Sequence, residues 1–133
     1  CIMHNRPKAE YGHFLIDMKK DLQRSLMLAD AAGIARDQII LDPGVGFGKT
    51  YEQNLAVLAH LDTFLDFELP LLLATSRKSV IGLTLDLPVE EREEGTMVTS
   101  VLAALNHWDM VRVHDVEKNV RALRMTEKIM SLQ

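Results

Sequence analysis

Polar side chains follow each of four short apolar runs in this sequence. Met3 and His4 close the first run, Asp42 the second, Ser76-Arg77-Lys78-Ser79 the third, and Arg112 and His114 the fourth. In a parallel sheet the carboxyl ends of the strands meet at one edge, which is where α/β enzymes bind their ligands. The four runs therefore predict a single ligand site built from four strand ends.

Arg112 and His114 are the pair best suited to an anion. Residues two apart in a strand point to the same face, and a guanidinium beside an imidazole makes a good phosphate pocket. The alternative is structural, with Arg112 paired to a carboxylate of a neighbouring strand and His114 capping the next helix. Asp115 is interpreted as the N-cap of that helix.

Asp42 ends a buried run and is followed by a loop with three glycines in five residues, Gly44 to Gly48. Glycines let a backbone turn sharply and approach a flat or anionic ligand. A carboxylate at this point can accept two hydrogen bonds from an amino-pyrimidinone edge. Alternatively it caps a helix or pairs with Lys78. The adjacent Lys49 favours a ligand site over an ordinary turn.

The glycine loop satisfies neither of two phosphate-binding motifs. A P-loop needs four residues between its first glycine and Gly-Lys-Thr, whereas only three separate Gly44 from Gly48. The dinucleotide motif G-x-G-x-x-G fails because the third glycine comes one residue early. Nucleotide binding by residues 44–50 and a plain strand-to-helix turn stay open as alternatives.

Composition describes a globular protein: 133 residues, 47% hydrophobic and 26% charged, with a net charge of −4. This charge gives no support for nucleic acid or an anionic membrane as partner, and no apolar run approaches the ~20 residues of a membrane helix. The single cysteine, Cys1, favours a reducing compartment, so we expect a cytoplasmic protein. No metal ligand set is predicted, because the other histidines lack suitable spacing: His13, His60 and His107.

The elements that must position these side chains alternate between strand and helix. Strands are predicted at residues 1–4, 39–42, 71–75 and 110–114, and a helix at about 12–32 with Gly33 as its cap. Two further helices are predicted from apolar stripes: Leu55, Leu58, Leu61 and Leu65 in the first, and Val98, Val101, Leu102 and Leu105 in the second. A closing helix starts near Val116. Such continuously apolar strands indicate a parallel sheet, either half of a (β/α)8 barrel or a small doubly wound sheet.

Three segments resemble motifs of the dihydropteroate synthase family, in the family's order: 41–50, 76–79 with Ile81-Gly82, and 112–116. The resemblance spans almost the whole chain. It implies an α/β fold in which residues 1–133 form the C-terminal half of a (β/α)8 TIM barrel, about four βα units, strands 5–8. The chain is accordingly interpreted as a fragment of a longer protein.

The resemblance also implies a reaction. The full enzyme, a transferase, would join 6-hydroxymethyl-7,8-dihydropterin diphosphate to p-aminobenzoate, giving dihydropteroate and diphosphate in folate biosynthesis, with sulfonamides as competitors. The isolated chain would be inactive. The alternative is a non-catalytic half-barrel that binds a pterin or a phosphate without turnover.

By the same resemblance, residue roles can be assigned. Pterin binding falls to Met3, Asp42, Phe47, Lys78 and Arg112, diphosphate binding to Arg112 and His114, the aminobenzoate pocket to Phe47, Lys78 and Ser79, and catalysis to Lys78, Arg112 and His114. Mg2+ would accompany the diphosphate, with its protein ligand in the missing half. The outer strands of a half-barrel are open edges, so we expect a homodimer or a strand-exchanged assembly.

Overall fold

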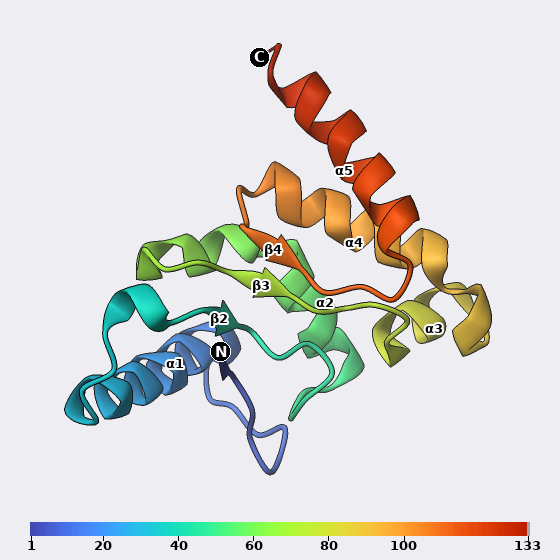
Figure 1. Cartoon of the computed structure of the whole chain (residues 1–133). Coiled ribbons are helices and arrows are strands. Elements are labelled where there is room, and N and C mark those ends of the chain that lie inside the picture. The colour runs from blue at the N-terminus through green and yellow to red at the C-terminus, as the bar shows by residue number, and fades with distance from the viewer. Residues whose placement is uncertain (133) are drawn as a thin grey trace.

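The computed structural model describes residues 1–132. Its four strands are β1 (Ile2–Met3), β2 (Leu41–Asp42), β3 (Leu72–Leu73) and β4 (Met110–Val111). β1 pairs with β2 and β3 with β4, both in parallel. A parallel bridge between Leu41 and Leu71 joins the two pairs, so the strands follow the order β1-β2-β3-β4 (Figure 1). The predicted α/β fold with parallel strands is confirmed, although each strand is shorter than predicted.

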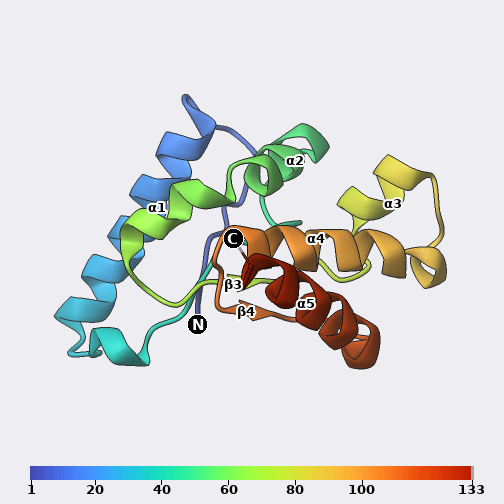
Figure 2. The same ribbon diagram turned by 90° about the horizontal axis from the view of Figure 1, so that it is seen from above.

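Helices follow every strand. They are α1 (Phe14–Ala31), α2 (Tyr51–Ala59), α3 (Ser79–Leu85), α4 (Glu93–Leu105) and α5 (Val116–Met130). Short 3-10 helices lie between them: η1 (Arg36–Gln38), η2 (Leu61–Phe67) and η3 (Val89–Glu91). α4 and α5 pack against each other, and α4 also contacts β4 (Figures 1 and 2). Residues 1–132 thus form four βα units, of which the third contains both α3 and α4.

α1 forms where its apolar spacing predicts, and its stripe of Met18, Leu22 and Ala29 is buried. The helix ends because Gly33 adopts a left-handed conformation, with φ of +75°. The Gly33 N–H donates to the Asp30 carbonyl at 2.9 Å and the Ile34 N–H to the Ala29 carbonyl at 3.0 Å. These two bonds form a Schellman motif, so the predicted glycine cap is confirmed.

The apolar stripe predicted for the second helix is confirmed only in part, since Leu61 is buried and Leu58 packs against the core. α2 begins with a capping box between Thr50 and Gln53, but it ends at Ala59, and η2 then changes the helical period. Leu55 and Leu65 are consequently exposed. The side chains buried here are Val57, Leu61, Phe64 and Phe67.

The stripe predicted for α4 is also confirmed only in part, since Leu102 packs against the core. Val98 is 59% exposed and Leu105 49% exposed, whereas the fully buried residues of this helix are Glu93 and four small side chains: Thr96, Thr99, Ser100 and Ala103. The hydroxyls of Thr99 and Ser100 find hydrogen-bond partners inside the protein. Thr99 lies 2.6 Å from Thr75 Oγ1, and Ser100 donates to Asn119 Oδ1 at 2.8 Å. α4 is therefore held by hydrogen bonds as well as by packing, which its hydropathy pattern does not show.

Candidate functional site

The polar strand ends lie on one edge of the sheet, as the sequence predicts. Met3 is in register with Asp42, and Leu73 with Val111. The chain leaves all four strands in the same direction, because all the pairings are parallel. The segments after the strands, which carry the predicted site residues, therefore adjoin each other.

Asp42 is buried, with 2% of its surface exposed. Its Oδ1 accepts a hydrogen bond of 2.7 Å from the Gly44 N–H, which the left-handed Gly44, with φ of +68°, turns back toward the carboxylate. Thr50, not Asp42, caps α2, and the ion pairs within residues 1–132 do not include Asp42. Neither structural alternative for this carboxylate is therefore observed.

Lys78 connects the glycine loop to the third strand end. Its ammonium donates to the Val45 carbonyl and lies 4.8 Å from the centre of the Phe47 ring, a cation–π contact. Burial lowers the pKa of Lys78, Asp42 raises it, and Arg112 lowers it again. The ammonium thus lies within the electrostatic reach of both the carboxylate and the guanidinium.

Arg77 and Lys78 have different surroundings, although both were predicted as cations at the head of a helix. Arg77 has a left-handed backbone, with φ of +59°. Its N–H donates to Thr96 Oγ1 at 3.1 Å and its carbonyl accepts from Arg92 Nη1 at 3.0 Å. Its side chain meets Glu93 Oε2 at 3.4 Å. The first turn of α4 therefore holds Arg77 and fixes the turn from which Lys78 projects.

Arg112 and His114 line one hollow of about 290 Å3 together with Lys78 and Ser76. Arg112 is exposed, and no ion pair in the described part of the chain includes it. Asp115, not His114, caps α5, accepting from the Lys118 N–H at 3.1 Å. The predicted convergence on one face is confirmed, and three basic side chains around a hollow suit an anion.

Ser76 fixes the histidine at this hollow. Its Oγ accepts from the His114 N–H at 3.1 Å and lies 2.7 Å from His114 Nδ1. Nε2 is therefore the ring nitrogen left to face a ligand. The sequence places Ser76 beside the site but gives no signal that it orients His114, because the contact joins residues 38 positions apart.

Met3 and Phe47 lie near the glycine loop, and both are partly exposed. A side chain added at Gly44 would meet Met3 Cγ at 3.3 Å, which places Met3 beside this turn. Ser79, by contrast, lines a separate hollow with Gly82 and Arg92. The structure thus brings Met3, Asp42, Phe47 and Lys78 together around the loop but does not bring Ser79 into the hollow of Arg112.

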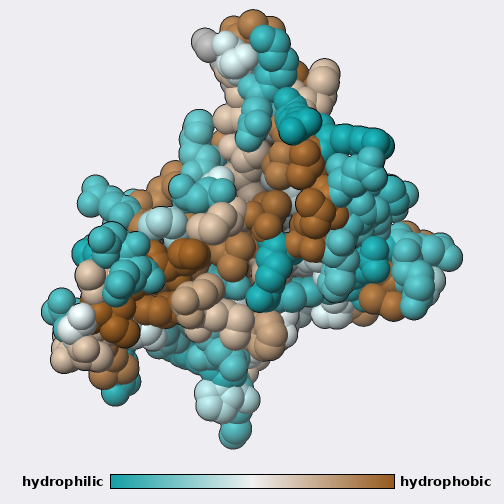
Figure 3. All heavy atoms as spheres, viewed as in Figure 1, coloured by the Kyte–Doolittle hydropathy of each residue, from teal (hydrophilic) through white to brown (hydrophobic). Residues whose placement is uncertain are grey.

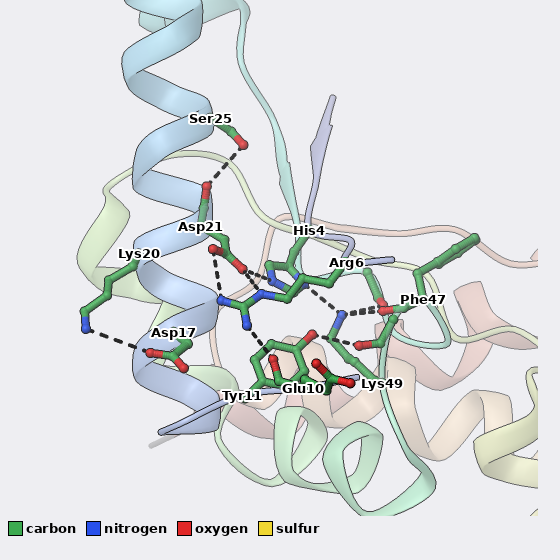
Figure 4. A network of polar contacts seen from close by, with 12 residues as sticks. His4, Arg6, Glu10, Tyr11, Asp17, Lys20, Asp21, Ser25, Phe47 and Lys49 are labelled. Atoms are coloured by element: carbon green, nitrogen blue, oxygen red, sulfur yellow. Dashed lines mark hydrogen bonds and ion pairs between the residues drawn. The ribbon is translucent and has the colours of Figure 1, made fainter. Parts of the chain in front are cut away.

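Lys49 does not face a ligand. Its ammonium donates to the Gly44 and Phe47 carbonyls, both at 2.9 Å, and lies 3.0 Å from His4 Nδ1 (Figure 4). Burial lowers its pKa to about 8. Since Thr50 caps α2, neither residue is available to hold phosphate. These contacts give no support to nucleotide binding by residues 44–50.

Neither a metal site nor a membrane-spanning helix is found among the described residues. No group of three or more His, Cys, Asp or Glu side chains in residues 1–132 could hold a metal ion. The hollow of Arg112 is basic, so it does not fit magnesium either. Within the same range, no helix has the length and apolar character needed to cross a membrane.

Residues 1–114 match the family described as pterin binding enzyme. This match covers well over half of the sequence, and the chain belongs to the pterin-binding enzyme family. The resemblance read from the motifs is thus confirmed.

The curated relatives are dihydropteroate synthases. The Clostridium beijerinckii protein is 51% identical over 130 residues, which are 97% of this chain and 48% of the relative. The Bacillus subtilis protein is 48% identical over 98% of this chain and 46% of its own length. The chain therefore spans about half the length of the curated relatives that it matches.

Solved structures agree with this. Clostridium difficile dihydropteroate synthase, solved in the presence of pteroic acid, has a TM-score of 0.94 and 45% identity over 97% of this chain and 49% of that one. A sulfonamide complex of the Yersinia pestis enzyme has a TM-score of 0.95 and 36% identity, covering 100% of this chain and 51% of that one.

Proposed function

We propose that this chain is the pterin- and diphosphate-binding part of a dihydropteroate synthase. The complete enzyme transfers the pterin methylene of 6-hydroxymethyl-7,8-dihydropterin diphosphate to the amino group of p-aminobenzoate. The observation that carries this proposal is the meeting of Asp42, Lys78, Arg112 and His114 at the ends of parallel strands. Similarity to dihydropteroate synthases along the chain supports it.

Asp42 holds the polar edge of the pterin ring. One of its oxygens already accepts from Gly44, and a carboxylate has further lone pairs for the amino and ring N–H groups of a pterin. Because Asp42 is buried, hydrogen bonds to its charge are stronger than in water. Met3 and Phe47 supply apolar surface beside the ring, and Lys78 adds a donor.

Arg112 and His114 hold the diphosphate and stabilise it as it leaves. The C–O bond to diphosphate breaks, the C–N bond to the aniline nitrogen forms, and that nitrogen loses a proton. Negative charge grows on the diphosphate, so cations fixed nearby stabilise the transition state more than the ground state. The aniline nitrogen needs little activation, and positioning supplies much of the remainder.

Phe47, Lys78 and Ser79 form the aminobenzoate pocket in this proposal, where sulfonamides compete. The Phe47–Lys78 contact supports a shared surface for an aromatic acid. The Yersinia pestis relative has been solved as a sulfonamide complex. Ser79 is exposed and directly follows Lys78, so its contribution depends on the part of the pocket that other segments provide.

Magnesium and a reducing compartment complete the proposal. Mg2+ would arrive with the diphosphate and take protein ligands from elsewhere, because residues 1–132 supply no ligand set. The free, exposed Cys1 suits the cytoplasm.

The chain would correspond to strands 5–8 of an eight-stranded barrel. β1 and β4 are the outer strands, and an apolar hollow of about 580 Å3 lies beside β4 and α5. Figure 3 shows apolar side chains gathered over this region of the face. Further strands would cover these surfaces in the complete enzyme, whereas the isolated chain would exchange strands with another copy.

A second apolar groove supports a homodimer. It measures about 530 Å3 and lies between α2, α3 and α4. The exposed side chains of Leu55, Leu85 and Val98 line it. The groove is formed by helices and not by the open edges of β1 and β4, so it would stay exposed after further strands complete the barrel.

A chimera tests the proposed function. This chain replaces the segment that it matches in the Clostridium beijerinckii enzyme, and diphosphate release is measured with both substrates. We expect turnover that a sulfonamide inhibits, none from the chain alone, and none from the chimera carrying Arg112→Ala. A folded chimera that binds pteroic acid but never releases diphosphate would favour the non-catalytic alternative.

A further inference from the structure

Lys49 is a lysine whose ammonium is turned into the protein. An ammonium carries three N–H donors, and the structure supplies three acceptors. These are the carbonyls of Gly44 and Phe47, both at 2.9 Å, and His4 Nδ1 at 3.0 Å (Figure 4). No donor is left for a ligand, so any role of Lys49 in binding must act through the groups it contacts.

His4 continues this contact toward α1. Its side chain is fully buried, and burial, followed by Lys49, lowers its pKa. Because Nδ1 accepts from the ammonium, the proton of the neutral ring lies on Nε2, which donates to Asp21 Oδ2 at 3.0 Å. Asp21 also accepts from Arg6 Nε at 2.6 Å and Nη2 at 3.2 Å. A chain of hydrogen bonds thus runs from the Lys49 ammonium through the neutral His4 ring to the Asp21 carboxylate on α1.

The same loop shapes the pterin part of the site. The Gly44 N–H holds Asp42, the Val45 carbonyl accepts from Lys78, and the Phe47 ring faces that ammonium. Lys49 binds carbonyls on either side of Val45, at Gly44 and at Phe47. The Gly44 carbonyl also accepts from the Phe47 N–H at 3.0 Å, so the ammonium is a second donor at that oxygen and links it to the more exposed Phe47 carbonyl. Without the ammonium this link is lost, and the turn from Gly44 to Phe47 would be free to shift.

We propose that Lys49 is a positioning residue: its ammonium closes the Gly44–Phe47 loop from inside and so holds Asp42 and Phe47 in place for the pterin ring. The inference rests on the proposed function of the site. It differs from a general stabilising role because it predicts greater damage to ring binding than to anion binding.

The test compares Lys49→Met with Lys128→Met, a matched change at an exposed lysine near the end of α5. Pteroic acid binding to the chain is measured by calorimetry and inorganic diphosphate binding by NMR. Lys49→Met should lower the affinity for pteroic acid by about tenfold or more, since hydrogen bonds to a charged group are lost. Diphosphate affinity should fall clearly less than pteroic acid affinity, because Arg112 and His114 lie on other elements and only Lys78 connects the hollow to the loop. Lys128→Met should change neither.

Two readouts separate positioning from loss of fold. In Lys49→Met, NMR of His4 should show its ring taking a proton at higher pH than in the parent chain, because a neighbouring cation is gone. In Lys49→Ala, added methylammonium should restore pteroic acid binding, whereas tetramethylammonium, which has no N–H, should not.

The outcomes are decisive in each direction. Unchanged pteroic acid affinity in Lys49→Met, or equal effects of the two ammonium ions in a folded Lys49→Ala, would overturn the proposal. A parent chain that binds no pteroic acid would count against the proposed function instead. The titration of His4 and the amide chemical shifts of residues 44–47 in Lys49→Met would then test the positioning role of Lys49. If neither changed, that role would be overturned.

Discussion

Gly33 and Gly44 share a left-handed backbone, but only one of them has room for a side chain. At Gly33, with φ of +75°, a methyl group would meet nothing within 4 Å. At Gly44, with φ of +68°, it would lie 1.9 Å from the His4 carbonyl oxygen. Alanine at both positions therefore separates backbone strain from close approach.

The expected costs differ in size. Gly33→Ala should lower the free energy of unfolding by about 1–2 kcal/mol, the cost of a left-handed alanine. Gly44→Ala adds the displacement of the first strand end, about 1–3 kcal/mol for overpacking, for a total of about 2–5 kcal/mol. That displacement also moves the Gly44 N–H away from Asp42, so ring binding should fall together with stability.

Urea unfolding followed by tryptophan fluorescence measures both variants. Trp108 is the single tryptophan, is buried, and donates to the Leu61 carbonyl at 3.2 Å. We expect Gly44→Ala to unfold at clearly lower urea than Gly33→Ala and to lose pteroic acid binding, which Gly33→Ala should keep. Equal urea midpoints for the two variants would refute the reasoning.

Four further outcomes are expected. Asp42→Asn should weaken the binding of pteroic acid by about 2–4 kcal/mol. An unchanged affinity in calorimetry would contradict the role proposed for Asp42 in pterin binding. Arg112→Ala should abolish diphosphate binding in NMR titrations, and Arg112→Lys should retain part of it. The affinity for diphosphate should fall with added salt, which screens charges over about 8–10 Å, and salt-independent binding would contradict this. Because the pKa of His4 is lowered from 6.5 in the folded chain, the unfolded chain binds the proton first on acidification. The free energy of unfolding should therefore decrease as the pH drops below 6.5, and His4→Gln should make that decrease smaller. Light scattering should show the isolated chain associating, and a monodisperse monomer would disagree with open edges at β1 and β4.

The strand ends could be predicted from the sequence because burial and polarity change there abruptly. Asp42, Arg112 and His114 each follow or end an apolar run, and parallel pairing then brings the runs to one edge. The direction of a lysine could not be predicted in this way. Lys49 turns inward because left-handed glycines aim two loop carbonyls at it, and Lys78 turns to the site because Arg77 takes up a strained turn.

The helix faces show a second limit. In α4 the hydropathy pattern selects Val98 as buried, but the structure buries Thr96 and Thr99. A threonine can be buried when its hydroxyl finds a partner, and Thr99 finds Thr75, 24 positions earlier. That partner is set by the tertiary fold, so a local pattern cannot reveal it. The exposed valine instead lines the groove between α2, α3 and α4.

The sheet has a seam between β2 and β3, where one bridge, Leu41 to Leu71, joins two strand pairs. Asp42 and the glycine loop belong to the first pair, whereas Arg112 and His114 belong to the second. A ligand that contains both a ring and a diphosphate would span this seam and resist its opening. Hydrogen exchange at the Leu41 amide, which donates to the Pro70 carbonyl at 2.9 Å, would then slow more with one linked molecule than with its two parts supplied separately.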